Sequence, residues 1–307
     1  TKIESIAGRY TFVWSNAIKT RKEKMAEQLE QMWNYAQSIA EEEDSDPTPP
    51  EFKTIDRDKI EKTAKKIEEI ISKNPKASTK AKAKLRYIQK NFSQNLDKYQ
   101  EQEKVLDGRG SYSKTDTDAT FMRMKDDHMQ NGQLKPAYNV QVSSQSQFVI
   151  HYTLHQTTND LNTLKPHLNT FEELYQFLPE ELTADAGYGS EENYDFLEEK
   201  NIETFVKYNT FDKEQGILKS KRKKINEDFH RDKLYYNEEK DQYICPMGQP
   251  MNKITNRNRK TKSGYAQTSS LYQAQNCNGC PLRGACHKAQ GNRIIERNQN
   301  LERHKER

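Results

Sequence analysis

The sequence contains few apolar residues and no long apolar run. Hydrophobic residues occupy 32% of its 307 positions, charged residues occupy 31%, and the mean hydropathy is −1.16. No stretch approaches the roughly 20 apolar residues that a membrane-spanning helix needs, and the first residues lack the apolar segment of a secretory signal. We therefore expect a cytosolic protein of about two domains, in which part of the length is solvated helix or loop rather than core.

Several motifs of common enzyme classes are also missing. The sequence has no P-loop, no Gly-x-Gly-x-x-Gly and no Gly-x-Ser-x-Gly, which are patterns of phosphate-binding loops, dinucleotide sites and serine hydrolases. Three histidines, His151, His155 and His167, fall near predicted strands or on the helix that follows them. Each of them alone is more typical of a structural or surface residue than of a catalytic base.

The positive charge is small in total but clustered. The net charge is +4, yet residues 219–224 are nearly all cationic and a second cluster lies between Lys253 and Lys262. Phosphate backbones attract such clusters, although a solvated loop explains any one of them equally well. The candidate DNA-binding residues are Lys219, Lys221, Arg222, Lys223, Lys224, Arg257, Arg259 and Lys260.

The first third of the chain is predicted to be mainly helical. Residues 1–14 are typical of a strand or hairpin. From Ser15 to about Leu106, apolar residues recur at helical spacing in three stretches, which are separated by the prolines of residues 46–50 and by Asn74-Pro75. We predict an inserted module of three amphipathic, partly coiled-coil helices.

An α/β pattern follows this module. Residues 137–142 and 148–154 are predicted strands, residues 161–177 a helix, and residues 203–208 another strand. Between them, a short apolar run leads to Asp185, and a helix begins after Ser190, a suitable N-cap. The order of elements predicts an α/β sheet that is interrupted early by the helical insertion.

Asp185 is the strongest candidate for a catalytic residue. It ends an apolar run and precedes Ala186-Gly187-Tyr188-Gly189, so the glycines allow a sharp turn and the carboxylate lies where open α/β sheets bind ligands. One interpretation is that Asp185 only caps the next helix or stabilises the turn. The other is that it binds a divalent metal, because Mg²⁺ takes one or two carboxylates together with water and phosphate oxygens.

Two other acidic segments are weaker candidates. Asp116 and Asp118 are spaced so that both could face one cation, but Asp-x-Asp in a loop more often forms an Asx-turn or a helix cap. We therefore favour a structural or accessory role for this pair. Asn159-Asp160 is interpreted as the N-cap of the helix that starts at Leu161.

The four cysteines lie in the last part of the chain. They are Cys245, Cys277, Cys280 and Cys286. The Cys-x-x-Cys pair and the Cys-Pro-Met-Gly turn fit a closed tetrahedral Cys₄ zinc site, in which His287 could replace Cys286. Another thiolate-bound metal, reduced non-ligand cysteines and disulfides are the alternatives, although disulfides are rare in cytosolic proteins. A metal would stabilise a region that has little hydrophobic content.

These segments together resemble bacterial insertion-sequence transposases of the DDE class, which have an RNase H-like catalytic domain. The matching segments are Thr1-Lys2-Ile3-Glu4-Ser5, Tyr10-Thr11-Phe12-Val13-Trp14, Thr115-Asp116-Thr117-Asp118-Ala119, Ala137-Tyr138-Asn139-Val140-Gln141, Ala184-Asp185-Ala186-Gly187-Tyr188, the Cys-Pro-x-Gly and Cys-x-x-Cys-Pro segments, and Arg293 to Arg307.

The resemblance implies DNA transposition, a form of DNA recombination carried out by a mobile element. In this family two Asp and one Glu hold two Mg²⁺ (or Mn²⁺) ions, which activate the attacking hydroxyl and stabilise the leaving oxygen during strand cleavage and strand transfer. Asp185 matches the second Asp. The implied partners are transposon-end and target DNA, the implied location is the bacterial cytoplasm at the nucleoid, and a homodimer is a further expectation.

The chain also departs from the family pattern. The family's first catalytic Asp comes before the segment that starts at Thr1, and its Glu comes beyond Arg307, so Glu296 and Glu302 are assigned to a connecting helix. Pro is usual where Thr117 stands, and Gly where Ala137 stands. We therefore expect a fragment of a transposase that is inactive as this chain alone.

The resemblance implies five consecutive parts. Residues 1–14 form the first strands of an RNase H-like core, 15–110 the inserted helical module, 111–215 the part of the core with Asp185, 216–290 a basic, Cys-rich zinc-binding insertion, and 291–307 the start of a connecting helix. The main alternative is a non-catalytic DNA-binding module with a structural zinc site. A metal-dependent nuclease of the same fold, unrelated to transposition, is a third interpretation.

Overall fold

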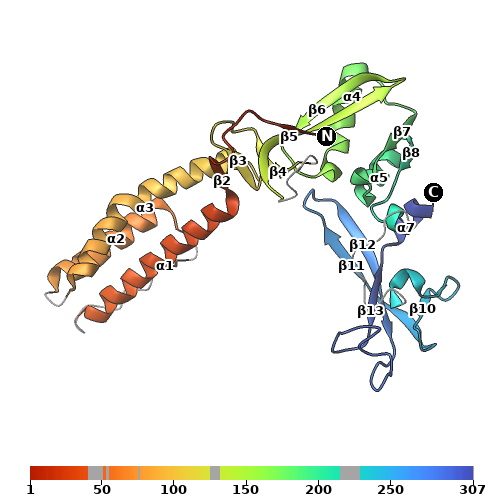
Figure 1. Ribbon diagram of the computed structural model, residues 1–307. Helices are drawn as coiled ribbons and strands as arrows, with labels where there is room; N and C mark the ends of the chain where they lie inside the picture. The colour runs from red at the N-terminus through yellow and green to blue at the C-terminus, as the bar shows by residue number, and fades with distance from the viewer. Residues whose placement is uncertain (41–50, 53–54, 75–76, 125–131, 215–228, 307) are drawn as a thin grey trace. The chain divides into compact units, whose positions relative to one another are not determined.

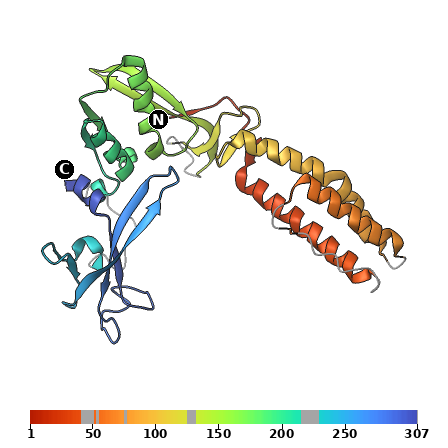
Figure 2. The same ribbon diagram turned by 180° about the vertical axis from the view of Figure 1, so that it is seen from behind.

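The computed structural model describes residues 1–40, 51–52, 55–74, 77–124, 132–214 and 229–306, and Figures 1 and 2 show it from two sides. The chain divides into two compact units, Thr1–Thr158 and Asn159–Arg307, and each is described by itself. Together they contain helices, antiparallel sheets and one parallel strand pair, so the chain is a mixed α/β protein. None of the described helices is both long enough and apolar enough to span a membrane.

The sheet of the first unit is organised around one long strand. Strand β5 (Leu134–Gln145) pairs with β1 (Lys2–Glu4) on one side and with β4 (Thr120–Arg123) and β6 (Phe148–His155) on the other, always antiparallel. The predicted strand pair at 137–142 and 148–154 is thereby confirmed. Residues 1–14 form two strands with different partners, because β2 (Phe12–Trp14) pairs with β3 (Ser111–Ser113) rather than with β1.

The three predicted helices are confirmed as α1 (Ser15–Ile39), α2 (Arg57–Lys73) and α3 (Thr79–Leu106). They pack side by side around one apolar core (Figure 1). Its most deeply buried members include Leu29, Trp33, Ile67, Ile88 and Phe92. These residues follow the helical spacing of the sequence, so the bundle is stabilised by the apolar stripe of each helix.

The first part of the second unit contains two helical segments followed by a strand–helix–strand segment. After the short 3₁₀ helix η1 (Asp160–Asn162) and helix α4 (Leu164–Tyr175), strand β7 (Glu181–Ala184) pairs in parallel with β8 (Glu203–Val206). The connection contains the 3₁₀ helix η2 (Ala186–Tyr188) and helix α5 (Glu191–Glu199), with Ser190 as N-cap as predicted. Helix α6 (Phe211–Glu214) follows.

The cysteine-rich part of this unit contains a five-stranded antiparallel sheet that the sequence patterns did not indicate. Its order is β13 (Ile294–Arg297), β12 (Ala266–Ala274), β11 (Pro250–Lys260), β10 (Gln242–Ile244) and β9 (Tyr236–Asn237). A one-turn 3₁₀ helix, η4 (Arg231–Lys233), precedes it and helix α7 (Gln299–Glu306) follows it. The core is small and includes Tyr243, Met251, Tyr272 and Ile295.

Candidate catalytic and metal-binding residues

Asp185 directly follows β7, at the carboxyl end of the parallel pair β7–β8. Its side chain is exposed, and its Oδ1 accepts a hydrogen bond of 2.8 Å from the backbone N–H of Gly187. Asp185 therefore caps η2, as one interpretation of the sequence expected. No described residue donates a hydrogen bond to Oδ2, so this oxygen is available to a ligand.

Two carboxylates lie close to the backbone of Gly187. A Cβ atom at position 187 would lie 2.8 Å from Asp185 Oδ1 and 3.2 Å from Asp160 Oδ2, closer than ordinary van der Waals contact. The Asn159 side chain caps η1, and Asp160 is the first residue of that helix. The local sequence of Asn159-Asp160 indicates a helix cap but not the position of the Asp160 carboxylate near Gly187, because the two residues come from separate segments of the chain.

The negative charge of these carboxylates raises the pKa of the neighbouring Tyr188 hydroxyl. Burial raises the pKa of its hydroxyl, and the nearby Asp160 and Asp185 raise it further, to about 12. Tyr188 therefore remains protonated at neutral pH. Asp160 and Asp185 thus both lie near the same hydroxyl group.

Asp116 is engaged within the first unit. It accepts hydrogen bonds from the Ser5 hydroxyl and, at 2.9 Å, from the Tyr138 hydroxyl. Burial alone would raise the pKa of Asp116, but these hydrogen bonds outweigh it and hold the pKa below its usual value. Asp118 is exposed and lies 3.3 Å from the Gln156 amide. These contacts fix the loop before β4 to β1 and β5, which supports a structural role.

All four cysteines are free thiols and line one small cavity of about 20 Å³ together with His287. A volume above roughly 10–15 Å³ holds one water-sized species, so the cavity has room for a single ion. The two turns predicted to hold cysteines are confirmed: Gly248 and Gly279 both have positive φ, 78° and 69°, in the Cys-Pro-Met-Gly and Cys-Asn-Gly-Cys segments.

N–H groups are directed at three of the four sulfur atoms. The backbone N–H of Gln249 lies 3.3 Å from Cys245 Sγ, and the backbone N–H of Arg293 lies 3.4 Å from Cys277 Sγ. The Arg293 guanidinium Nη1 lies 2.9 Å from Cys286 Sγ. N–H groups in this position can hydrogen-bond to the sulfur ligands of a metal and orient them.

Two buried groups lie next to the sulfurs, and one of them, Arg293, donates hydrogen bonds to Cys286 Sγ and to the Phe229 carbonyl oxygen. Arg293 is 8% exposed and pairs with no carboxylate among the described residues, although buried cations are normally paired. Both ring nitrogens of His287 are buried without a hydrogen-bond partner in the described part of the chain. A metal–thiolate centre would supply a negative charge for the first group and a ligand for the second.

The distances between the cysteine sulfur atoms are longer than those between the ligands of a closed zinc site. Among the described residues, only Asp195, Glu198 and His304 bring three ligand atoms within 4.8 Å of one another. Metal binding would therefore draw the cysteine sulfurs together. The donor set, the cavity and the N–H groups fit a metal, while the final ligand geometry is not formed in this structure.

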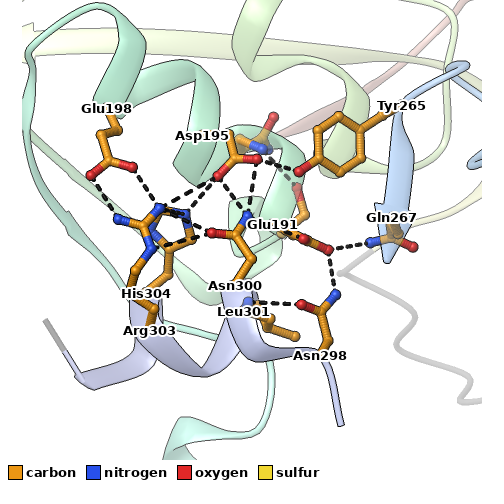
Figure 3. Close-up of polar contacts among 12 residues, drawn as sticks. Glu191, Asp195, Glu198, Tyr265, Gln267, Asn298, Asn300, Leu301, Arg303 and His304 are labelled. Atoms are coloured by element: carbon orange, nitrogen blue, oxygen red, sulfur yellow. Dashed lines mark hydrogen bonds and ion pairs between the residues drawn. The ribbon is translucent and has the colours of Figure 1, made fainter. Parts of the chain in front are cut away.

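The cluster of Asp195, Glu198 and His304 belongs to a polar network that joins α5 to α7 and β12 (Figure 3). Asp195 accepts hydrogen bonds from the Tyr265 hydroxyl and from Asn300, and lies 2.7 Å from His304 Nε2. Glu198 accepts two hydrogen bonds from Arg303, at 2.8 and 2.7 Å. The carboxylate oxygens are thus already engaged, so we interpret the cluster as an attachment between helices rather than as a metal site.

The network extends along one face of α5. Glu191 accepts hydrogen bonds from Gln267 of β12 at 2.9 Å and from Asn298 at 2.5 Å. Glu191, Asp195 and Glu198 share one helical face because they are spaced by four and three residues. Their spacing indicates a common face, but the sequence alone gives no sign of the partners that this face binds. The helix that follows Asp185 is thereby fixed to both the cysteine-rich sheet and α7.

The predicted DNA-binding residues are only partly described. Residues 219–224 lie outside the described residues. Arg257 and Arg259 are exposed on β11 but lie 3.7 and 3.4 Å from Glu296 Oε2, which reduces their net positive charge. Lys260 is exposed at the end of β11, next to the turn that leads to β12.

A comparison with known protein families gives one match. Residues 244–307 match the family model described as a transposase DDE domain, which supports a DDE-class transposase. The matched residues include the four cysteines, Arg293 and α7, whereas Asp185 lies before them. No curated protein and no solved structure matches the chain.

Proposed function

We propose that this chain supplies Asp185 as one of the carboxylates that hold the divalent metal ions with which a DDE-class transposase cleaves and joins DNA strands at transposon ends. Mg²⁺ or Mn²⁺, when bound, would activate the attacking hydroxyl and stabilise the leaving oxygen at phosphorus. A new phosphorus–oxygen bond forms in line with the one that breaks. In this proposal the catalytic carboxylate is Asp185, within an RNase H-like core that the helical module and the cysteine-rich sheet interrupt.

The observation that supports this proposal is the setting of the Asp185 carboxylate. One oxygen is fixed by Gly187 N–H and the other is open, at the carboxyl end of a parallel strand pair. Asp160 Oδ2 also lies close to Gly187, so we assign Asp160 an accessory role, in which it adds negative charge near Asp185. Asp116 and Asp118 remain accessory acidic candidates without an assigned metal contact.

Metal-directed cleavage of the chain tests the site without requiring catalysis. Fe²⁺ substituted for Mg²⁺, with ascorbate and peroxide, should cut the backbone near residues 160 and 185–188. Asp185→Asn should remove these cuts, whereas Glu180→Gln, an exposed carboxylate change next to the start of β7, should preserve them. Cuts that persist in Asp185→Asn would show that this residue does not hold the metal.

We further propose that Cys245, Cys277, Cys280 and Cys286 bind one structural zinc ion. His287 is the alternative fourth ligand, because its ring nitrogens are buried beside the same cavity. A zinc ion with four thiolates has a net charge of about −2, which the Arg293 guanidinium would partly neutralise. Protein purified without chelators should contain about one zinc per chain, and its absence would contradict the zinc proposal while leaving Asp185 untouched.

The second candidate function is a non-catalytic DNA-binding module with a structural zinc site. It is favoured by one specific observation, the hydrogen bond through which Asp185 caps η2. In that case Asp185→Ala would change neither the affinity for DNA nor its salt dependence.

A further inference from the structure

We propose that one side of helix α3 is a contact surface for the DNA backbone, in addition to the Asp185 site. This α3 basic face consists of Lys82, Arg86 and Lys90, all exposed in the first half of the helix. The inference goes beyond the proposed chemistry, because it concerns the helical module and needs no metal.

The charge along α3 is strongly asymmetric. From Thr79 to Asn95 the helix contains five cations and no carboxylate, the other two cations being Lys80 and Lys84. From Leu96 to Leu106 two lysines are balanced by Asp97, Glu101 and Glu103. A face selected only for solubility would mix both signs, as the second half of α3 does.

The cations of the α3 basic face are available to a ligand. Lys82, Arg86 and Lys90 form no ion pair with any described residue, whereas Lys84 is turned towards α1 and donates to Gln31 Oε1 at 3.2 Å. Lys82, Arg86 and Lys90 recur every four residues, so they form a row about 12 Å long. Duplex DNA has one negative charge per roughly 1.7 Å of axis, so such a row faces several phosphates.

Helix stability does not explain this placement. Cations near the N-terminus of a helix oppose its macrodipole, and α3 has no acidic residue in its first turn. Helix α2 of the same bundle follows the favourable pattern, with Asp56 as N-cap, Asp58 in the first turn and Lys73 in the last. The basic start of α3 is therefore a cost to the helix that a negatively charged partner would offset.

The surface is held in a fixed shape by the core beneath it. Ile88 and Phe92 are almost completely buried on the opposite side of α3, and the Ser78 hydroxyl caps the helix through Ala81 N–H. The cations therefore project from a packed helix rather than from a loop, which limits the ordering cost of binding to their own side chains.

The test is the salt dependence of DNA binding by the 307-residue chain. Lys82→Gln/Arg86→Gln/Lys90→Gln removes three charges from the α3 basic face. The control variant Lys62→Gln/Lys65→Gln/Lys66→Gln removes three exposed positive charges from α2. In α2 these lysines are flanked in the sequence by carboxylates, Glu61 before them and Glu68 and Glu69 after them. Both variants have the same net charge, and glutamine preserves helix propensity, which far-UV circular dichroism verifies.

Fluorescence anisotropy with a labelled duplex at several NaCl concentrations gives the slope of log affinity against log salt. Each lost phosphate contact lowers this slope by about 0.9, so the α3 variant should lose about 2.7 and the α2 variant much less. Equal slopes for the two variants and the unchanged chain would overturn the inference. Asp185→Asn should leave the α3 effect intact, so failure of the metal site and failure of this surface are distinguishable.

Discussion

The helical module and the cysteine-rich sheet are stabilised in different ways. The three helices bury a continuous set of apolar side chains, including Trp33, Ile67 and Ile88. The five-stranded sheet has a small core, and next to it lie a buried arginine without a carboxylate partner and a histidine whose ring nitrogens have no hydrogen-bond partner, both among the described residues. The first region is stabilised by its apolar stripes, whereas the second has fewer buried apolar side chains, and we propose that a metal compensates for this.

The largest expected effect is on folding: the cysteine-rich sheet should depend on metal, and the helical module should not. Removing zinc with a strong chelator, or changing Cys277→Ser, should unfold the sheet β9–β13, because zinc binding contributes about 10–16 kcal/mol to the folding of small zinc modules. Hydrogen–deuterium exchange should show faster exchange in these strands and no change in α1–α3. Unchanged exchange in the strands after chelation would contradict the difference between the regions.

A core substitution in the helices should destabilise the helical module and leave the cysteine-rich sheet unchanged. Phe92→Ala removes a side chain that is 2% exposed, and we expect a loss of about 3–5 kcal/mol in the free energy of unfolding of the bundle. Urea denaturation followed by circular dichroism measures this loss, and the zinc content should stay the same. The matched control is Tyr87→Ala on the exposed side of α3, which should cost less than about 0.5 kcal/mol.

A smaller effect is expected for the cation beside the sulfurs. Arg293→Gln should weaken zinc binding by about 10- to 100-fold, the usual effect of removing a group that hydrogen-bonds to a metal ligand. Competition with a zinc chelator of known affinity gives this value. Arg257→Gln, on an exposed arginine of the same sheet, should bind zinc normally, and an equal loss in both variants would argue against a specific role for Arg293.

The smallest expected effect concerns the attachment of α7 to α5. Burial would raise the pKa of Asp195, but hydrogen bonds from Tyr265, Asn300 and His304 outweigh it and hold the pKa below the usual 3.8. The ionised carboxylate therefore stabilises the folded state above pH 3.8, and this contribution is lost as the pH falls through the folded pKa. Amide exchange in α7 should accelerate in that acidic range, and Asp195→Asn should remove this pH dependence.

The sequence predicted some elements well and others not at all. The helices of the module are confirmed because the apolar residues recur at one spacing over many turns, and β5, β6 and the cap at Ser190 depend on local patterns of the same kind. Strand β11 gave no such indication, since most of its residues are polar and exposed. Its pairing with β12 depends on backbone hydrogen bonds that a hydrophobic pattern does not reveal.

The candidate sites also divide into residues that local sequence patterns indicate and residues that only the folded chain brings together. Asp185 and the cysteines could be identified from their neighbours in the chain, because turns with glycine and Cys-x-x-Cys spacing are local features. Asp160 beside Asp185, Arg293 beside Cys286, and the network of α5 with α7 come from segments distant in the sequence. Which side chains meet in these places depends on how the chain folds back.

By itself, the sequence determined the residue types that can bind metal or phosphate and the helices that bury an apolar stripe, because both depend on composition and short-range spacing. The folded chain brings the carboxylates of Asp160 and Asp185 close to Gly187 and buries Arg293 beside Cys286 without an acidic partner among the described residues. It also leaves one face of α3 uncovered. The physical reason is that burial and charge pairing depend on which surfaces the folded chain removes from water.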